Sequence, residues 1–160
     1  MKAGEGTNTK LNFSYIVGFV DGEGCFSITI NKHRKKEEVR LLFEIELRED
    51  DLEILKRIQY TLKCGNIYHL RYKRYQKWKP HYKYKVSNFS DIKTKIIPFF
   101  RKYPLQAKKK HSFEKFCLVA EMIRRKQHLS VQGIQKIKGI RNLVSDSLDA
   151  LEAHVQWGAV

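Results

Sequence analysis

The sequence predicts an α+β fold in which helices cover one face of a four-stranded antiparallel sheet. One observation is the alternation of apolar and polar side chains over residues 25–31 and 39–47, which is typical of strands that bury one face. A second is that apolar side chains recur at helical spacing before, between and after the predicted strands. The resulting order is helix, two strands, helix, two strands and then helices, written αββαββα.

The first helix is predicted to begin at Asn12 or Ser14, because both side chains are good N-caps. Its buried face carries apolar side chains at helical spacing: Phe13, Ile16, Val17 and Val20. Gly18 within this helix costs about 1 kcal/mol relative to alanine, which favours a role in close backbone packing. The helix ends at residues 21–24, Asp-Gly-Glu-Gly, whose glycines suit a sharp exit into a strand. Glu23 is therefore expected at the mouth of that turn.

Two strands and a second helix follow. The charged run from Lys32 to Glu38 is predicted to connect the two strands as a hairpin. Alternate residues of these strands face the core: Phe26, Ile28, Ile30, Val39, Leu41, Phe43, Ile45 and Leu47. The other face of the second strand carries Glu38, Arg40, Leu42, Glu44 and Glu46. A helix is then predicted from Asp50 or Asp51 to about Leu62.

The second half of the chain repeats this pattern. Strands are predicted over about 66–74 and 81–88, and helices over 91–100, 112–125 and 130–144, with a last helical turn or two in 145–155. The three cysteines lie far apart without metal-ligand spacing, so neither a zinc site nor a disulfide framework is expected. Cys117 falls on an apolar helix face, so we expect it to be a buried free thiol. Residues 1–10 are predicted to be a flexible tail and residues 11–155 a single domain.

The composition favours a polyanionic partner. Lys and Arg number 32 against 17 Asp and Glu among 160 residues, which leaves a formal net charge of +15. The electrostatic field of such a charge attracts polyanions. Nucleic acid is the favoured partner, and an anionic membrane surface is the second candidate. No apolar run approaches the roughly 18 residues of a membrane span, and the N-terminus lacks the features of a signal or transit peptide. We therefore expect a protein that is not a membrane protein and acts in the compartment where it is made.

A polar face of the predicted sheet is the candidate surface for nucleic acid. Between Tyr68 and Lys85 the chain has seven Lys or Arg and six aromatic residues but no acid, so the hairpin does not compensate its own charge. A solvated hairpin with tyrosines packed on lysine stems would explain the aromatics but not the missing acids. If Ile67, Tyr84 and Val86 point to the core, strand parity assembles one donor-rich face suited to the major groove of DNA. Its members are Ser27, Thr29, Asn31, Arg40, Glu44, Tyr68, Arg74, Lys83, Lys85 and Ser87.

The decapeptide at residues 15–24, Tyr-Ile-Val-Gly-Phe-Val-Asp-Gly-Glu-Gly, resembles the LAGLIDADG motif of homing endonucleases. The first glycine, both acids and the final glycine match the motif. The αββαββα order is that of the family's fold, so the resemblance extends over about residues 11–145. Residues 102–105 resemble the segment before the family's long helix, and residues 128–134 resemble the close of a family repeat. The alternative is a core helix with a solvated acidic C-cap.

The resemblance implies a metal site at the end of the first helix. Glu23 is expected to hold the catalytic divalent metal with help from the Gly22 carbonyl, with Mg²⁺ as the expected ion and Ca²⁺ or Mn²⁺ as substitutes. A lysine before the long helix completes the family's site; Lys108 is the first choice and Lys109 the second, with DNA backbone contact alone as the alternative. Two motif helices pack side by side in the family, so the expected partner is a second copy of the chain. The interface would comprise Tyr15, Gly18, Phe19, Asp21 and Gly22.

The function implied by the resemblance is that of a site-specific homing endonuclease. It would make a staggered double-strand break in a long, nearly palindromic double-stranded DNA target, with the polar sheet face as a DNA-binding saddle. Asn31, Arg40 and Glu44 would read bases. The alternatives are an RNA-binding intron maturase, a noncatalytic DNA-binding protein of the same fold, and one half of a two-repeat protein. The resemblance is consistent with coding by an intron. The expected location is then the mitochondrion or chloroplast that encodes the protein, or the cytoplasm of a prokaryote.

Overall fold

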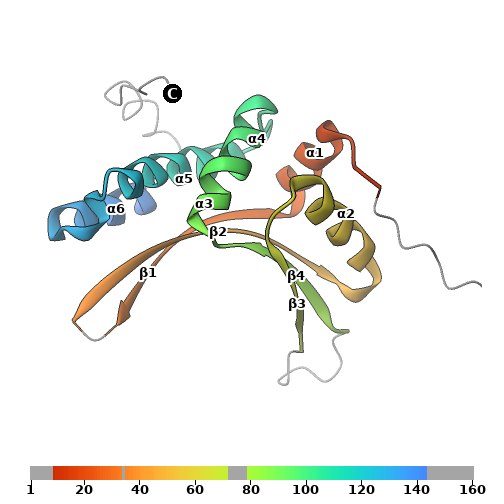
Figure 1. The fold of residues 1–160 in the computed structure, drawn as a ribbon, viewed down its shortest axis with the longest axis horizontal. Coiled ribbons are helices and arrows are strands. Elements are labelled where there is room, and N and C mark those ends of the chain that lie inside the picture. The colour runs from red at the N-terminus through yellow and green to blue at the C-terminus, as the bar shows by residue number, and fades with distance from the viewer. Residues whose placement is uncertain (1–8, 34, 72–78, 144–160) are drawn as a thin grey trace, which may run out of the picture.

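The structure, a computed structural model, describes residues 9–33, 35–71 and 79–143. Helices lie on one side of a four-stranded antiparallel sheet, and the two hairpins of the sheet spread away from them like the sides of an arch (Figure 1). The α+β class and the αββαββα order are thereby confirmed. Most of the predicted tail, the predicted final helical turns and Arg74 lie outside the described residues.

Helix α1 (Phe13–Glu23) begins at Asn12, whose side chain accepts a hydrogen bond from the Ser14 N–H at 2.8 Å. The helix ends at Glu23, within the exit predicted at residues 21–24, and Gly24 already has extended backbone, with φ at −76°. Gly24 is therefore not required for a left-handed backbone conformation. A Cβ at Gly24 would lie 2.6 Å from Val20 Cγ1 and 2.9 Å from the Val20 carbonyl oxygen. Gly24 is needed for space, because the strand folds back directly against the helix end.

The strands run in the order β1-β2-β4-β3 across the sheet. They are β1 (Gly24–His33), β2 (Lys36–Arg48), β3 (Asn66–Leu70) and β4 (His81–Val86). The first hairpin is tighter than predicted, because β1 and β2 stay paired out to His33 and Lys36 and so shorten the expected connection. Backbone pairing of charged residues at a hairpin end is not visible in a hydrophobic pattern. Strand parity is as predicted, with Phe43, Ile45, Tyr84 and Val86 almost fully buried.

The helical layer begins with a short 3₁₀ turn (Glu49–Asp51) that leads into α2 (Leu52–Leu62). The helix predicted over 91–100 is a composite of α3 (Phe89–Asp91), a π-helical turn (Ile92–Ile96) and α4 (Ile97–Lys102). Pro98 lacks the N–H that a regular helix would use at this point, so a widened turn beside it is physically reasonable. Helix α5 (Lys109–Arg124) starts three residues before the prediction, and α6 (Val131–Asn142) is capped by Ser130 as predicted.

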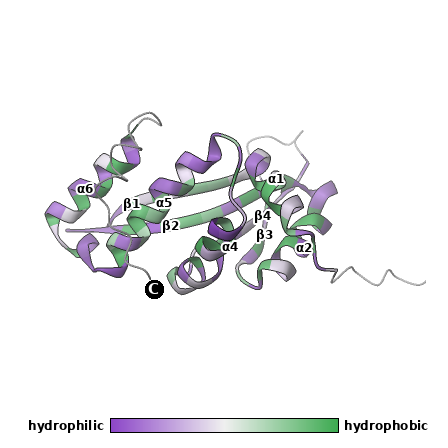
Figure 2. Ribbon diagram, turned by 90° about the horizontal axis from the view of Figure 1, so that it is seen from above, coloured by the Kyte–Doolittle hydropathy of each residue, from purple (hydrophilic) through white to green (hydrophobic). Residues whose placement is uncertain are grey.

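The core lies between the sheet and the helices. Viewed from above, α5 lies over β1 and α2 over β4, with apolar stretches of the strands beneath them (Figure 2). Phe26 is at the centre, with its ring 4.9 Å from that of Phe43 and 5.1 Å from that of Phe113, measured between centroids. Cys117 is a buried free thiol, as expected. The helical layer thus packs on the sheet through one continuous apolar core.

Candidate active site and nucleic-acid interface

The end of α1 presents two carboxylates with different roles. Asp21 accepts hydrogen bonds from the backbone N–H groups of Gln106, at 2.8 Å, and Ala107, at 3.2 Å. Both of its oxygens therefore hold the segment that leads into α5. Glu23 is exposed, and within the described residues its carboxylate makes no hydrogen bond or ion pair. Of these two acids, Glu23 is the one available to an external ligand.

A lysine lies against the same turn. Lys109 is the first residue of α5, is half-buried, and donates a hydrogen bond from Nζ to the Gly24 carbonyl oxygen. Lys108 and Lys110 are exposed. Lys108, the first choice from the family resemblance, precedes α5, whereas Lys109 is the first residue of that helix. Of the three lysines, Lys109 is the one whose ammonium group contacts the motif turn, at Gly24, the residue that follows Glu23.

The structure brings the sequence-predicted DNA-binding residues onto one face of the sheet. Strand register sets Thr29 beside Arg40, and Tyr68 beside Lys83. This sheet face, which is turned away from the helices, carries Ser27, Thr29, Asn31, Arg40, Glu44, Tyr68, Lys83 and Lys85. Ser87 lies just past the end of β4 and is exposed.

Acids on β2 neutralise the lysines of β4, contrary to the expectation that the charge of the second hairpin is uncompensated. The β2–β4 charge network comprises Glu44, Glu46, His81, Lys83 and Lys85. Lys83 Nζ lies 3.7 Å from Glu44 and 3.3 Å from Glu46, Lys85 Nζ lies 3.9 Å from Glu44, and His81 Nδ1 lies 3.1 Å from Glu46. The hairpin contains no acid of its own, but the neighbouring strand supplies two. Sequence reasoning missed His81 and the pairing of Glu46, because both depend on the register between β2 and β4.

Comparison with known proteins places these features in a family. A model of the LAGLIDADG endonuclease family matches residues 16–120, which is more than half of the chain and includes the motif turn, the sheet and α5. The chain belongs to the LAGLIDADG endonuclease family. Among curated relatives, the probable intron-encoded endonuclease 2 of Neurospora crassa is 31% identical over 129 residues. An uncharacterized cox1 intron-2 protein of Schizosaccharomyces pombe is 33% identical over 135 residues.

These relatives are longer proteins. The LAGLIDADG chain described here matches them over 81% and 84% of its own length, but it spans only 26% of the Neurospora protein and 39% of the Schizosaccharomyces protein. Solved structures show two size classes. The homing endonuclease I-TnaI matches with a TM-score of 0.75 and 28% identity, over 92% of this chain and 100% of that one. I-SmaMI was solved with an uncleaved DNA target in the presence of calcium ions. It matches with a TM-score of 0.74 and 29% identity, over 84% of this chain and 45% of that one.

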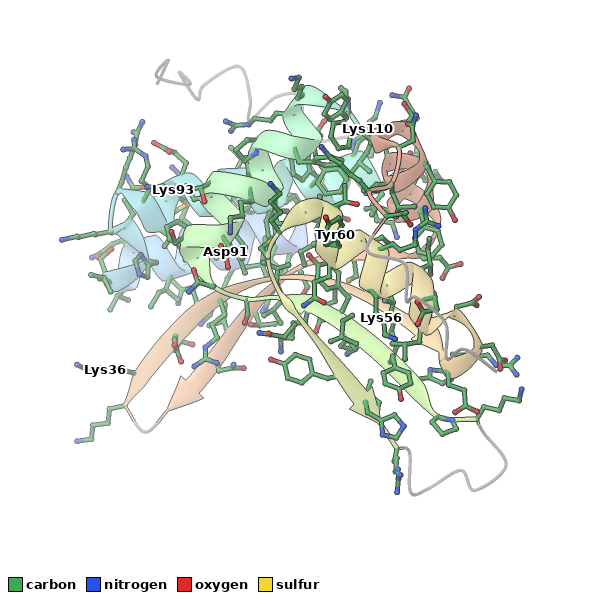
Figure 3. All side chains as sticks on the ribbon, turned by 45° about the vertical axis from the view of Figure 1, so that its right-hand side comes forward. Lys36, Lys56, Tyr60, Asp91, Lys93 and Lys110 are labelled. Carbon is green, nitrogen blue, oxygen red and sulfur yellow. The ribbon has the colours of Figure 1, made fainter. Side chains whose placement is uncertain are left out.

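Positive charge is abundant in the later helices of this LAGLIDADG chain, where residues 89–143 contain 14 Lys or Arg. Between residues 89 and 143 the acids are Asp91, Glu114 and Glu121, and each contacts a basic side chain of its own helix. Lys93 and Lys110 extend outward from this layer, whereas Lys36 lies at the end of the first hairpin (Figure 3). The described residues of the sheet face carry charges of both signs, among them Glu44, Glu46, Lys83 and Lys85. Net charge alone therefore does not identify the nucleic-acid surface.

Two features are absent from the described part of the chain. No helix there is both long and apolar enough to cross a membrane. Within the same residues, no cluster of three or more His, Cys, Asp or Glu side chains forms a ready-made metal site. Among the described residues, Glu23 therefore does not belong to such a cluster.

Proposed function

We propose that this chain is a site-specific DNA endonuclease of the homing type. In this proposal a homodimer makes a staggered double-strand break in a long, nearly palindromic DNA target by divalent-metal-dependent hydrolysis. The observation that carries it is the position of Glu23. Glu23, whose side chain is exposed, is the last residue of α1 and precedes Gly24, the first residue of β1, whose carbonyl oxygen accepts the hydrogen bond from Lys109.

Glu23 and the Gly22 carbonyl would hold the metal. Both are oxygen donors, which Mg²⁺ prefers, and Ca²⁺ or Mn²⁺ would fit the same donors. One carboxylate is too few for a protein-held site, so Glu23 of a second copy and phosphate oxygens of the DNA would complete the ligand set. When bound, the metal would supply Lewis-acid activation of water and neutralise charge at the scissile phosphate.

Lys109 would provide the positive charge beside the reacting phosphate. Its Nζ is held by the Gly24 carbonyl, so its ammonium group is already oriented before substrate arrives. A preorganised donor of this kind stabilises charge that develops in the transition state. Asp21 fixes the backbone of residues 106 and 107 and thereby sets where α5 and its first lysine begin. Lys108 and Lys110, both exposed, would contact the DNA backbone instead.

A second copy of the chain would pack on the open face of α1. Gly18 and Gly22 are exposed, and a Cβ at either position would meet no atom of this chain within 4 Å. Tyr15, on the same helix, is 49% exposed and stacks on Phe19. A hollow of about 390 Å³ lies beside this face, lined by Ser14, Val17, Gly18, Asp21, Lys102, Tyr103, Pro104 and Gln106. Two glycines four residues apart allow a second helix to approach closely. No neighbouring atom of this chain requires a glycine at either position, which supports a twofold contact between copies.

The setting we propose is an intron of an organellar genome, and a mitochondrial one in particular. Support comes from the relatives, one of which is named as intron-encoded and another after a cox1 intron, both in fungi. The intron maturase alternative shares this setting. The two functions differ in chemistry, because a maturase would bind RNA without requiring Glu23 as a metal ligand.

A cleavage assay tests the proposal. Duplexes that bind the protein would be selected from a pool randomised over about two helical turns, roughly 20 base pairs. We expect the selected duplexes to be cut with Mg²⁺ and left intact with EDTA. Glu23→Gln should abolish cleavage and keep binding within about tenfold, or about 1.4 kcal/mol. Glu53→Gln, an exposed acid on α2 with the same charge change, is the control. Equal cleavage by the Glu23→Gln variant would refute the assignment.

A further inference from the structure

The β2–β4 charge network lies at the centre of the sheet face that the proposed function assigns to DNA. β2 and β4 are the two inner strands, and their register pairs Glu44 with Lys85 and Glu46 with Lys83. Lys83 contacts both carboxylates, at 3.7 Å and 3.3 Å, so the two cross-strand pairs are joined. The Glu44 and Glu46 side chains are 19% and 29% exposed, which leaves each open on the sheet face.

This arrangement is poorly suited to binding phosphates alone. A carboxylate that faces a polyanion is repelled by it, and each lysine of the network already has a carboxylate close to its ammonium group. Removing the two acids would raise affinity for any DNA sequence. An element that weakens non-specific binding is useful only when a particular partner compensates for the repulsion. In the major groove the partners available to a carboxylate are amino groups of bases.

We propose that the charge network selects G·C base pairs in each half-site. Glu44 and Glu46 would accept hydrogen bonds from cytosine N4 amino groups. Lys83 and Lys85 would donate to the O6 and N7 atoms of the paired guanines. This inference rests on the proposed DNA-binding function and adds the identity of the bases read by the inner strands.

The chemistry of the two kinds of base pair decides the preference. A G·C pair presents an amino donor beside two acceptors in the major groove, which matches a carboxylate beside an ammonium group. An A·T pair also offers a donor and acceptors, but it carries the thymine methyl group. An apolar methyl against this network would remove water from charged groups and return no hydrogen bond. The carboxylate and ammonium groups, 3.3 to 3.9 Å apart, are close enough to meet neighbouring groups of one base pair.

Selection from the same randomised duplex pool, followed by sequencing of the bound molecules, tests the inference on the full chain. Binding would be measured with Ca²⁺, so that recognition is scored apart from cleavage. We expect the wild-type protein to require G·C pairs at two or more positions of each half-site, with about tenfold weaker binding for A·T there. Glu44→Gln should shift one of those positions from cytosine towards adenine, because a glutamine amide pairs with adenine N6 and N7. Glu46→Gln should do the same at another position.

Glu53→Gln makes the same charge change on α2, outside the sheet, and should leave the base profile unchanged. Circular dichroism would establish that each variant is folded, and Lys85→Met provides a second test through loss of the guanine preference. If the wild type and all three network variants bind DNA specifically with identical base profiles, that result would overturn this inference and leave the proposed function standing. Absence of sequence-specific DNA binding by the wild type would overturn the proposed function and this inference with it.

Discussion

The Asp21 carboxylate at the end of α1 accepts a hydrogen bond at 2.8 Å from the backbone N–H of Gln106, which lies 85 positions further along the chain. The Ala107 N–H donates to the other oxygen of the same carboxylate. The start of α5 is thereby tied to the motif turn. Because Lys109 is the first residue of α5, this tie also sets the position of its ammonium group beside Gly24. Asp21 thus helps to position Lys109 against the turn that contains Glu23.

Asp21→Asn tests this positioning role. An amide offers one oxygen for two N–H donors and no charge, so we expect unfolding to become easier by about 1 to 2 kcal/mol. The rate of DNA cleavage should fall at least tenfold under conditions where sedimentation shows the dimer to be intact. Asp50→Asn, at an exposed acid that contacts Lys79 at 3.2 Å, serves as the control in both measurements. Wild-type cleavage and stability in Asp21→Asn would show that the tie has no such role.

The two lysine candidates give opposite predictions. Lys109→Met should lower the maximal cleavage rate by about 10² or more, because it removes a preorganised positive charge while retaining the side-chain volume. Lys108→Met should change that rate little and reduce the salt dependence of binding by about one unit, as expected for a phosphate contact. Single-turnover cleavage and binding at several salt concentrations separate the two effects. The reverse ranking would restore the order that the sequence suggested.

Gly18→Leu examines the proposed dimer surface. No atom of this chain lies within 4 Å of a Cβ at this position, so the monomer should fold, with a gain of up to about 1 kcal/mol in helix propensity. The bulk of leucine would, however, prevent close approach of a second α1. Sedimentation equilibrium should show dissociation, and double-strand cleavage should be lost. Gly139→Leu in α6 is a matched control, since it is also exposed and has open space around its Cβ position. An intact dimer in Gly18→Leu would place the interface elsewhere.

Glu121 should give α5 a small pH-dependent stabilisation. Hydrogen bonds from Arg124 and Arg125 hold the pKa of its carboxyl at about 2, below its ordinary value of 4.5. A lowered pKa in the folded state stabilises above the unfolded pKa, and the stabilisation is lost as the pH falls through the folded pKa. Glu121→Gln should therefore unfold more easily at pH 7 by at most about 0.5 kcal/mol, because the side chains of both arginine partners are 49% exposed and solvent screens the ion pairs. Urea unfolding should show this difference shrinking between pH 4.5 and about 2. A difference that does not change with pH would mean that charge is not its cause.

Local patterns in the sequence were sufficient to determine the elements of the fold. Period-two alternation assigned Phe43 and Ile45 to the core and Glu44 to the opposite face, and burial in the structure agrees. The cap at Asn12 and the apolar face of α1 were equally predictable. These features depend on residues that are close in sequence, so the chain encodes them locally. The resemblance of residues 15–24 to a known motif then pointed to the family that the comparison confirmed.

Contacts between distant segments were decided only by the tertiary structure. The hairpin of residues 66–86 contains no acid between Tyr68 and Lys85, yet β2 supplies Glu44 and Glu46 to its lysines through a register that neither segment specifies alone. The choice between Lys108 and Lys109 depends on where α5 begins, and Asp21 sets that point through a contact with Gln106, which lies 85 positions later in the sequence. The physical reason is common to both cases. Strand register and helix start follow from packing the whole core, and a charged side chain finds its partner only after that packing is complete.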